Sequence, residues 1–85
     1  MTWRVIVAPR AQKDLDALDP PVARRVLDAL ERLAESHRGR LKRLQGTDEE
    51  LRLRVGDWRV RLMLDHQQRA INVLRIRHRR EAYRE

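Results

Sequence analysis

Four arginines that alternate with apolar residues around a Gly-Asp pair are the residues whose types and spacing most clearly indicate chemistry. They are Arg52, Arg54, Arg59 and Arg61, in the stretch LRLRVGDWRVRLM that begins at residue 51. A guanidinium stays charged at all physiological pH values, and its planar fork matches the oxygens of a phosphate. Several such groups on one surface would bind a polyanion and would stabilise negative charge that develops on a reacting phosphate.

The same stretch predicts a β-hairpin that positions these arginines. Period-two alternation on both sides of Gly56-Asp57 is typical of two half-buried strands joined by a two-residue turn. In that register Arg54 lies opposite Arg59 and Arg52 lies opposite Arg61. The other face then carries three apolar pairs, which are Val55–Trp58, Leu53–Val60 and Leu51–Leu62. Because like charges opposed across strands destabilise a sheet, a polyanionic partner would explain the arginine face.

The charge of the whole chain favours the same kind of partner. The formal net charge is +7 and the sequence pI is about 11.3. Residues 1–36 hold six Lys or Arg and six Asp or Glu, so the whole excess lies in residues 37–85. A basic half on a small domain indicates nucleic acid first, and the alternative is a soluble surface that happens to be basic.

Length and composition limit the class of protein. The 85 residues predict a single domain, 1–85, with a small core. The chain has no cysteine, which excludes disulfides and thiolate metal sites and fits a reducing compartment. We find no apolar run of membrane-spanning length and no signal-peptide pattern, and therefore expect a cytoplasmic protein with no membrane partner.

The amino-terminal half predicts a strand and two helices. Residues 3–8 (WRVIVA) favour a strand, and residues 10–18 favour a short helix. Asp19 is a typical N-cap with prolines in the first turn of a second helix, which reaches about Ser36. The apolar stripe of this helix is Val22, Val26, Leu27, Leu30, Leu33 and Ala34. We assign no chemistry to the two helices.

The carboxy-terminal half predicts three further strands. Residues 39–50 form a connecting loop, the hairpin strands follow, and residues 70–76 (AINVLRI) form the last strand. The ending RHRREAYRE is too short for an independent helix and is expected to be an ordered tail or a single turn. The fold class is therefore α+β, with antiparallel strands, two helices packed on one face and the arginine face left open.

Several of these pieces closely resemble the RelE/ParE superfamily of bacterial toxins from type II toxin–antitoxin systems. The pieces are the A-x-x-D-L helix (Ala11, Asp14, Leu15), LKRLQG before the hairpin, LRLRVGDWRVRL itself, and the ending IRHRREAYR. The resemblance covers nearly the whole chain. It implies a small curved sheet with two helices in the order β-α-α-β-β-β. It also implies a cognate antitoxin that covers the basic face.

Activities divide within this superfamily. RelE-like members cut mRNA in the ribosomal decoding site, whereas ParE-like members poison DNA gyrase without being nucleases. An arginine and then a tyrosine near the carboxyl terminus are similar to the RelE-like nucleases, and here they are Arg79 and Tyr83. We therefore favour a metal-independent mRNA endoribonuclease that acts on the ribosome. The alternatives are a gyrase inhibitor and an inactive basic nucleic-acid-binding module.

The chain departs from the RelE pattern at two places. The RelE-type enzyme carries two alternating lysines on the first hairpin strand, and the corresponding positions here are Glu50 and Arg52. The spacing between Arg79 and Tyr83 is also shorter. Both departures concern the identity of the general base.

RNA cleavage by the neighbouring 2′-hydroxyl requires a base, positive charge at the phosphate and an acid for the leaving 5′-oxygen. We assign the positive charge to Arg54, Arg59 and Arg79. Tyr83 is the candidate base by resemblance, since guanidiniums favour a phenolate. His78 is its competitor, because an imidazole titrates near neutrality. The expected phosphate contacts are Arg52, Arg61, Arg75, Arg77, Lys42 and Arg43. No metal site and no cofactor is expected.

Structural roles compete with these assignments. Arg52 and Arg61 could be solvated strand residues, and Tyr83 could only pack the carboxyl terminus. Trp58 falls on the apolar face, so we expect it to fill the core rather than stack on a base. His37 and His66 are expected on the surface.

Overall fold

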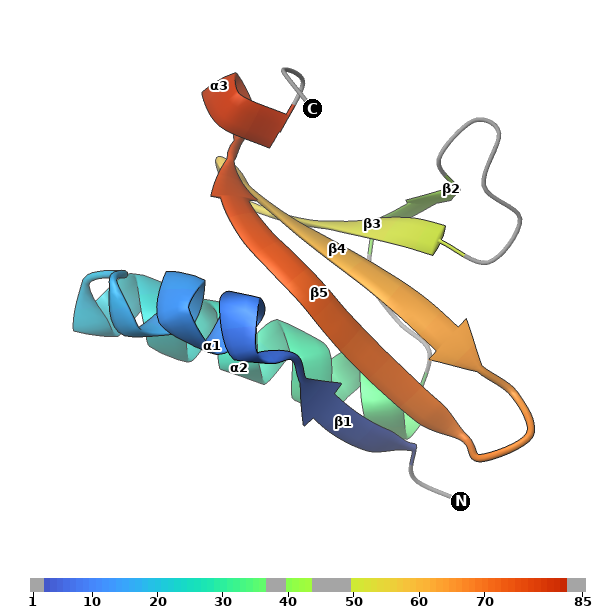
Figure 1. The fold of residues 1–85 in the computed structure, drawn as a ribbon. Coiled ribbons are helices and arrows are strands. Elements are labelled where there is room, and N and C mark those ends of the chain that lie inside the picture. The colour runs from blue at the N-terminus through green and yellow to red at the C-terminus, as the bar shows by residue number, and fades with distance from the viewer. Residues whose placement is uncertain (1–2, 37–39, 44–49, 83–85) are drawn as a thin grey trace.

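The computed structural model describes residues 3–36, 40–43 and 50–82, in which a short and a long helix cover one face of a sheet (Figure 1). In chain order the elements are β1 (Arg4–Val7), α1 (Pro9–Asp16), α2 (Pro20–Ser36), β2 (Arg40–Arg43), β3 (Glu50–Val55), β4 (Trp58–Asp65), β5 (Ala70–His78) and α3 (Arg79–Ala82). The α+β class and the two helices on one face are confirmed. The end of the chain forms a single helical turn, α3, as far as residue 82.

The described strands form one sheet in the order β1-β5-β4-β3-β2. The three consecutive strands β3, β4 and β5 are antiparallel, as expected. β1 pairs in parallel with β5, because the helical crossover returns the chain to the same end of the sheet, so the sheet is mixed at this edge. β2 is a strand inside the segment for which we expected a loop, and Leu41 aligns with Leu53 of β3.

The predicted hairpin register is confirmed at every pair. Val55 aligns with Trp58, and the opposed arginine pairs follow along the strands. Gly56 has φ +58, the left-handed conformation that a two-residue hairpin turn requires and that glycine adopts without strain. The next pair of strands is less regular: the register shifts between Arg61 and Leu62, where β5 contributes one extra residue, Leu74.

The core lies between the apolar face of the sheet and the two helices. Its largest fully buried side chains are Leu30, Leu33, Leu53, Leu62, Ile71, Val26, Val60 and Val73. Trp58 packs against this cluster, as the sequence indicated. Leu27 is an exception to the predicted stripe of α2, because 42% of it is exposed. None of the helices in the described ranges is long and apolar enough to cross a membrane.

Candidate nucleic-acid interface

The sheet face opposite the helices carries two rows of basic residues on β3, β4 and β5, and each row is aligned with a basic position of β2. The first basic row consists of Arg40, Arg54, Arg59 and Arg77, and the second of Lys42, Arg52, Arg61 and Arg75. Each row is continuous because neighbouring members are aligned partners on β2, β3, β4 and β5. Two rows of like charge in direct register oppose sheet pairing. A bound polyanion would remove this repulsion.

Arg54 and Arg59 are aligned partners in the first basic row, yet they have different surroundings. Arg54 is exposed, as expected. Arg59 is only 7% exposed, and its Nη1 donates hydrogen bonds to the backbone carbonyls of Gly56 at 3.0 Å and Trp58 at 3.1 Å. Arg59 therefore lies on the predicted face of the sheet, but its side chain is buried where we expected it to be exposed. Its guanidinium bridges two backbone carbonyls at the hairpin turn, so its positive charge is buried below the surface of the sheet.

The second basic row contains an ion pair that the sequence reasoning did not foresee. Arg61 Nη2 lies 2.7 Å from Glu50 Oε1, and the two side chains are 29% and 11% exposed. Period-two alternation along β3 puts Glu50 on the same face as Arg52 and Arg54. The Glu50 carboxylate therefore compensates the charge of Arg61.

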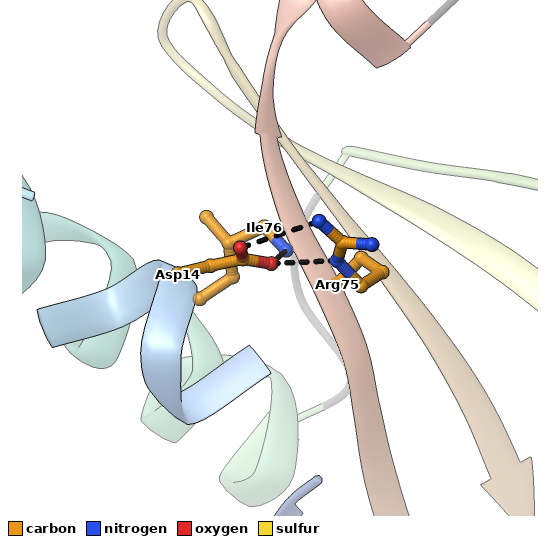
Figure 2. A network of polar contacts seen from close by, with 3 residues as sticks. All are labelled: Asp14, Arg75 and Ile76. Carbon is orange, nitrogen blue, oxygen red and sulfur yellow. Dashed lines mark hydrogen bonds and ion pairs between the residues drawn. The ribbon is translucent and has the colours of Figure 1, made fainter. Parts of the chain in front are cut away.

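Arg75 is held by a residue of α1. Its Nε donates to Asp14 Oδ2 at 2.8 Å and its Nη2 lies 3.4 Å from Asp14 Oδ1, while the Ile76 backbone N–H donates to Oδ2 at 2.9 Å (Figure 2). β1 pairs with β5 only as far as Val73, and α1 packs along β5. Asp14 therefore caps the edge of β5 as well as pairing with an arginine.

The surroundings of Asp14 favour its charged form. Burial raises the pKa of the Asp14 carboxyl, but the hydrogen bonds from Arg75 and the Ile76 N–H, with the charges of Arg75 and Arg77, outweigh this and hold the pKa below its ordinary value. Sequence reasoning assigned no chemistry to this helix. The sequence did offer a signal for this contact, namely Asp14 of the A-x-x-D-L motif. It directly precedes Leu15, which packs against the core.

Arg79 is brought to the same end of the sheet as the first basic row. Its backbone N–H donates to the Asp57 carbonyl at 2.7 Å, and its Nη1 lies 3.9 Å from Asp57 Oδ1. Both side chains are more than half exposed. Since Arg59 is bonded to the neighbouring carbonyl of Gly56, Arg59 and Arg79 both contact residues of the hairpin turn, and Arg54 is the aligned partner of Arg59.

His78 is not part of this group. It aligns with Trp58, and the two rings meet edge to face with centroids 5.3 Å apart. Its Nδ1 lies 3.3 Å from the backbone N–H of Arg80, which donates to it at the start of α3. Strand alternation places His78 on the opposite face from Arg77. The geometry therefore gives His78 a packing contact with Trp58 on the face opposite the basic rows.

The remaining candidates lie in β2 or outside the described residues. Tyr83 is outside the described residues, as is His37. Lys42 and Arg43 lie in β2, where only the backbone is described, and Arg43 aligns with Leu51 and so belongs to neither basic row. Among the described side chains, no group of three or more His, Asp or Glu residues is arranged to hold a metal ion.

Comparison with known families gives a match over almost the whole chain. Residues 5–83 match the model described as the ParE toxin of the type II toxin–antitoxin system parDE. No curated protein sequence matches the chain.

Solved structures share the fold. The archaeal RelE–RelB complex from Pyrococcus horikoshii matches with TM-score 0.79 and 27% identity, covering 93% of this chain and 97% of that chain. A mutant of Escherichia coli RelE in the free state matches with TM-score 0.77 and 21% identity over 100% and 94% of the two chains. The RelBE2 toxin–antitoxin complex from Mycobacterium tuberculosis matches with TM-score 0.76 and 22% identity over 92% and 99%.

Proposed function

The chain belongs to the ParE toxin family of the RelE/ParE superfamily and is a toxin of type II toxin–antitoxin systems, and we propose that it acts as a ribosome-dependent mRNA endoribonuclease. The observation that carries this proposal is the pair of basic rows on the open face of the sheet. Such a surface is suited to the phosphates of a single strand of RNA. Action on translated mRNA would occur in the cytoplasm.

The residues at the hairpin end supply the positive charge that cleavage needs. The 2′-oxygen attacks the adjacent phosphorus, the bond to the 5′-oxygen breaks, and the leaving 5′-oxygen takes up a proton from water. The products are a 2′,3′-cyclic phosphate and a 5′-hydroxyl. Arg54 and Arg79 are exposed beside the turn and would contact the phosphate as negative charge accumulates. Arg59 would act from beneath, by fixing the turn. Tyr83 is the proposed base that accepts the 2′-hydroxyl proton.

The proposed partner in the resting state is a cognate antitoxin. The structural neighbours from Pyrococcus horikoshii and Mycobacterium tuberculosis are complexes of toxin with antitoxin. An antitoxin segment that carries carboxylates would complement the two basic rows and exclude RNA from them. Inhibition by charge complementarity would weaken as salt concentration increases.

Inhibition of DNA gyrase is the second candidate function. The observation that favours it is the matching family model, which describes ParE toxins. This function would need a protein-binding surface and would not depend on Tyr83. An inactive basic module is the remaining alternative.

Induced expression in a bacterial host separates these functions. Messenger RNA 5′ ends and gyrase-trapped DNA breaks are mapped in the same cells, with Arg79→Ala as the matched variant. We expect new mRNA ends inside translated codons that disappear in the variant. DNA breaks with intact mRNA would instead assign the gyrase function, and normal growth with neither change would assign a binding module.

A further inference from the structure

The open face continues beyond the two basic rows as a third row that carries no cation. Its members are Glu50, Met63, Asn72 and Ile6, aligned across β3, β4, β5 and β1. Ile6 is 43% exposed, and Met63 and Asn72 are partly exposed. The chemistry of the face therefore changes from guanidinium to thioether and amide within one step along the strands.

A pocket opens at this place, where β4 leads into the β4–β5 turn. It has a volume of about 410 Å³ and is lined by Met63, Leu64, Asp65, His66, Gln67 and Asn72. The volume lies within the range of small-molecule sites. Asp65 Oδ1 accepts the backbone N–H of Gln68 at 3.1 Å, and the His66 ring meets Trp3 edge to face at 5.3 Å. These two contacts order the turn that forms the wall of the pocket.

The lining matches the two parts of a nucleobase. The Met63 side chain offers a polarisable apolar surface for the face of a ring. The amide of Asn72 offers one acceptor and two donors, the arrangement that pairs with the N6 and N7 edge of adenine. Recognition of single-stranded RNA commonly uses unstacked bases held in this way.

We propose that this pocket is a nucleobase subsite, with a preference for adenine, for the RNA strand whose phosphates lie on the second basic row. Arg61 and Met63 lie on the same face of β4 and are two residues apart, which separates them by roughly 7 Å along the strand. A nucleotide with its phosphate at Arg61 and Arg52 would therefore reach the pocket with a neighbouring base. The inference rests on the proposed function, because it takes RNA as the ligand.

The chain offers two convenient reporters for a test by NMR. Met63 is one of only two methionines, the other being Met1, and Asn72 is the only asparagine. Selective labelling of methionine methyl groups and of the asparagine amide therefore reports directly on the pocket. The probes are three RNA pentamers: uridine at all positions, uridine with one central adenosine, and uridine with a central abasic site.

We expect the adenosine pentamer to shift both reporters along one saturation curve and to bind about tenfold more tightly than the all-uridine pentamer. Asn72→Leu, which keeps the side-chain volume, should remove this difference while retaining the phosphate-dependent binding. Gln68→Ala, in the same turn but outside the lining, should leave it unchanged. Asn72→Thr replaces the leucine variant if the latter does not fold.

Three results would overturn the inference. In the first, the abasic pentamer shifts the reporters as strongly as the adenosine pentamer, so that only phosphates bind. In the second, Asn72→Leu retains the preference for adenine. In the third, the reporters respond to an antitoxin peptide and to no RNA. Because the assay needs neither ribosomes nor cleavage, its failure is distinguishable from the failure of the nuclease function.

Discussion

The carboxylate of Glu50 lies 2.7 Å from the guanidinium of Arg61 on the face of the sheet that is otherwise basic. The pair links β3 to β4 and is mostly buried, so it restrains Arg61 and offsets part of its charge. From the sequence this face appears uniformly cationic, but the structure places a carboxylate on it and so makes its charge uneven. Exposed charge is concentrated near the hairpin turn, and the second basic row contains two compensated arginines, Arg61 and Arg75.

Neutralising Glu50 should strengthen RNA binding. Glu50→Gln retains a hydrogen-bond partner for Arg61 but removes the negative charge, so affinity for single-stranded RNA should increase several-fold. The slope of log affinity against log salt concentration should become steeper by about 1, since one further phosphate contact is made. Fluorescence anisotropy across a salt series measures both quantities. Glu31→Gln on exposed α2 is the control, and an equal increase there would contradict this account.

Arg59 and Arg54 should respond differently to truncation. Arg59→Ala removes two hydrogen bonds at a buried site and should lower the free energy of unfolding by about 2–4 kcal/mol. Arg54→Ala, at the aligned exposed position, should change it by less than about 0.5 kcal/mol. Urea denaturation measures both values. Activity should be lost in both variants, and equal stabilities would mean that the Arg59 bonds to the turn do not form.

Asp14 should stabilise the fold in a pH-dependent manner. Its folded-state pKa lies below its unfolded value, so its contribution is present above about pH 4 and is lost as the pH decreases through the lowered pKa. Asp14→Asn should cost about 1–3 kcal/mol of unfolding free energy at pH 7, and the difference from wild type should shrink below pH 4. Denaturation at several pH values measures this.

The control for Asp14 lies on the same helix. Asp16 is exposed and accepts a hydrogen bond from Gln12 at its surface. Asp16→Asn should therefore change stability little at any pH. A difference between wild type and Asp14→Asn that persists undiminished at low pH would show that the carboxylate charge is not what Arg75 and the Ile76 N–H recognise.

Substitutions at Tyr83 and His78 should distinguish a role in RNA cleavage from a role in packing. Tyr83→Phe should slow cleavage strongly and leave RNA affinity unchanged, because only the proposed proton acceptor is removed. His78→Gln should lower thermal stability, because it removes the ring contact with Trp58, and should leave the cleavage rate of the folded protein unchanged. Single-turnover rates and melting temperatures measure the two effects. An unchanged rate in Tyr83→Phe would transfer the base role to the ribosome.

The features that sequence predicted best are those with strict periodicity. Alternation around Gly56-Asp57 determined the hairpin register, and the position of Trp58 on the apolar face followed from it. β2 was missed because RLKR carries a single apolar residue and so lacks the alternation that predicts a strand, although it pairs with β3, the next strand in the chain. The parallel pairing of β1 depends on where the helices return the chain, which local patterns do not encode.

The surroundings of individual polar side chains were less predictable. Alternation indicates the face on which Arg59 lies but not that its guanidinium folds back onto the turn carbonyls. Asp14 and Arg75 are 61 residues apart in the chain, so their contact requires the tertiary structure. Asn72 gave a signal that could have been used: it is the one amide within an otherwise apolar stretch of β5.

The most direct test of the nuclease function uses purified components. Ribosomes are programmed with a defined mRNA, and the toxin is added as wild type or as Arg54→Ala, with DNA gyrase and supercoiled plasmid in parallel reactions. We predict mRNA products with 2′,3′-cyclic phosphate and 5′-hydroxyl ends, formed only when ribosomes are present and only by the wild type. Intact mRNA together with gyrase-linked plasmid breaks would contradict the account and assign the chain to the gyrase inhibitors.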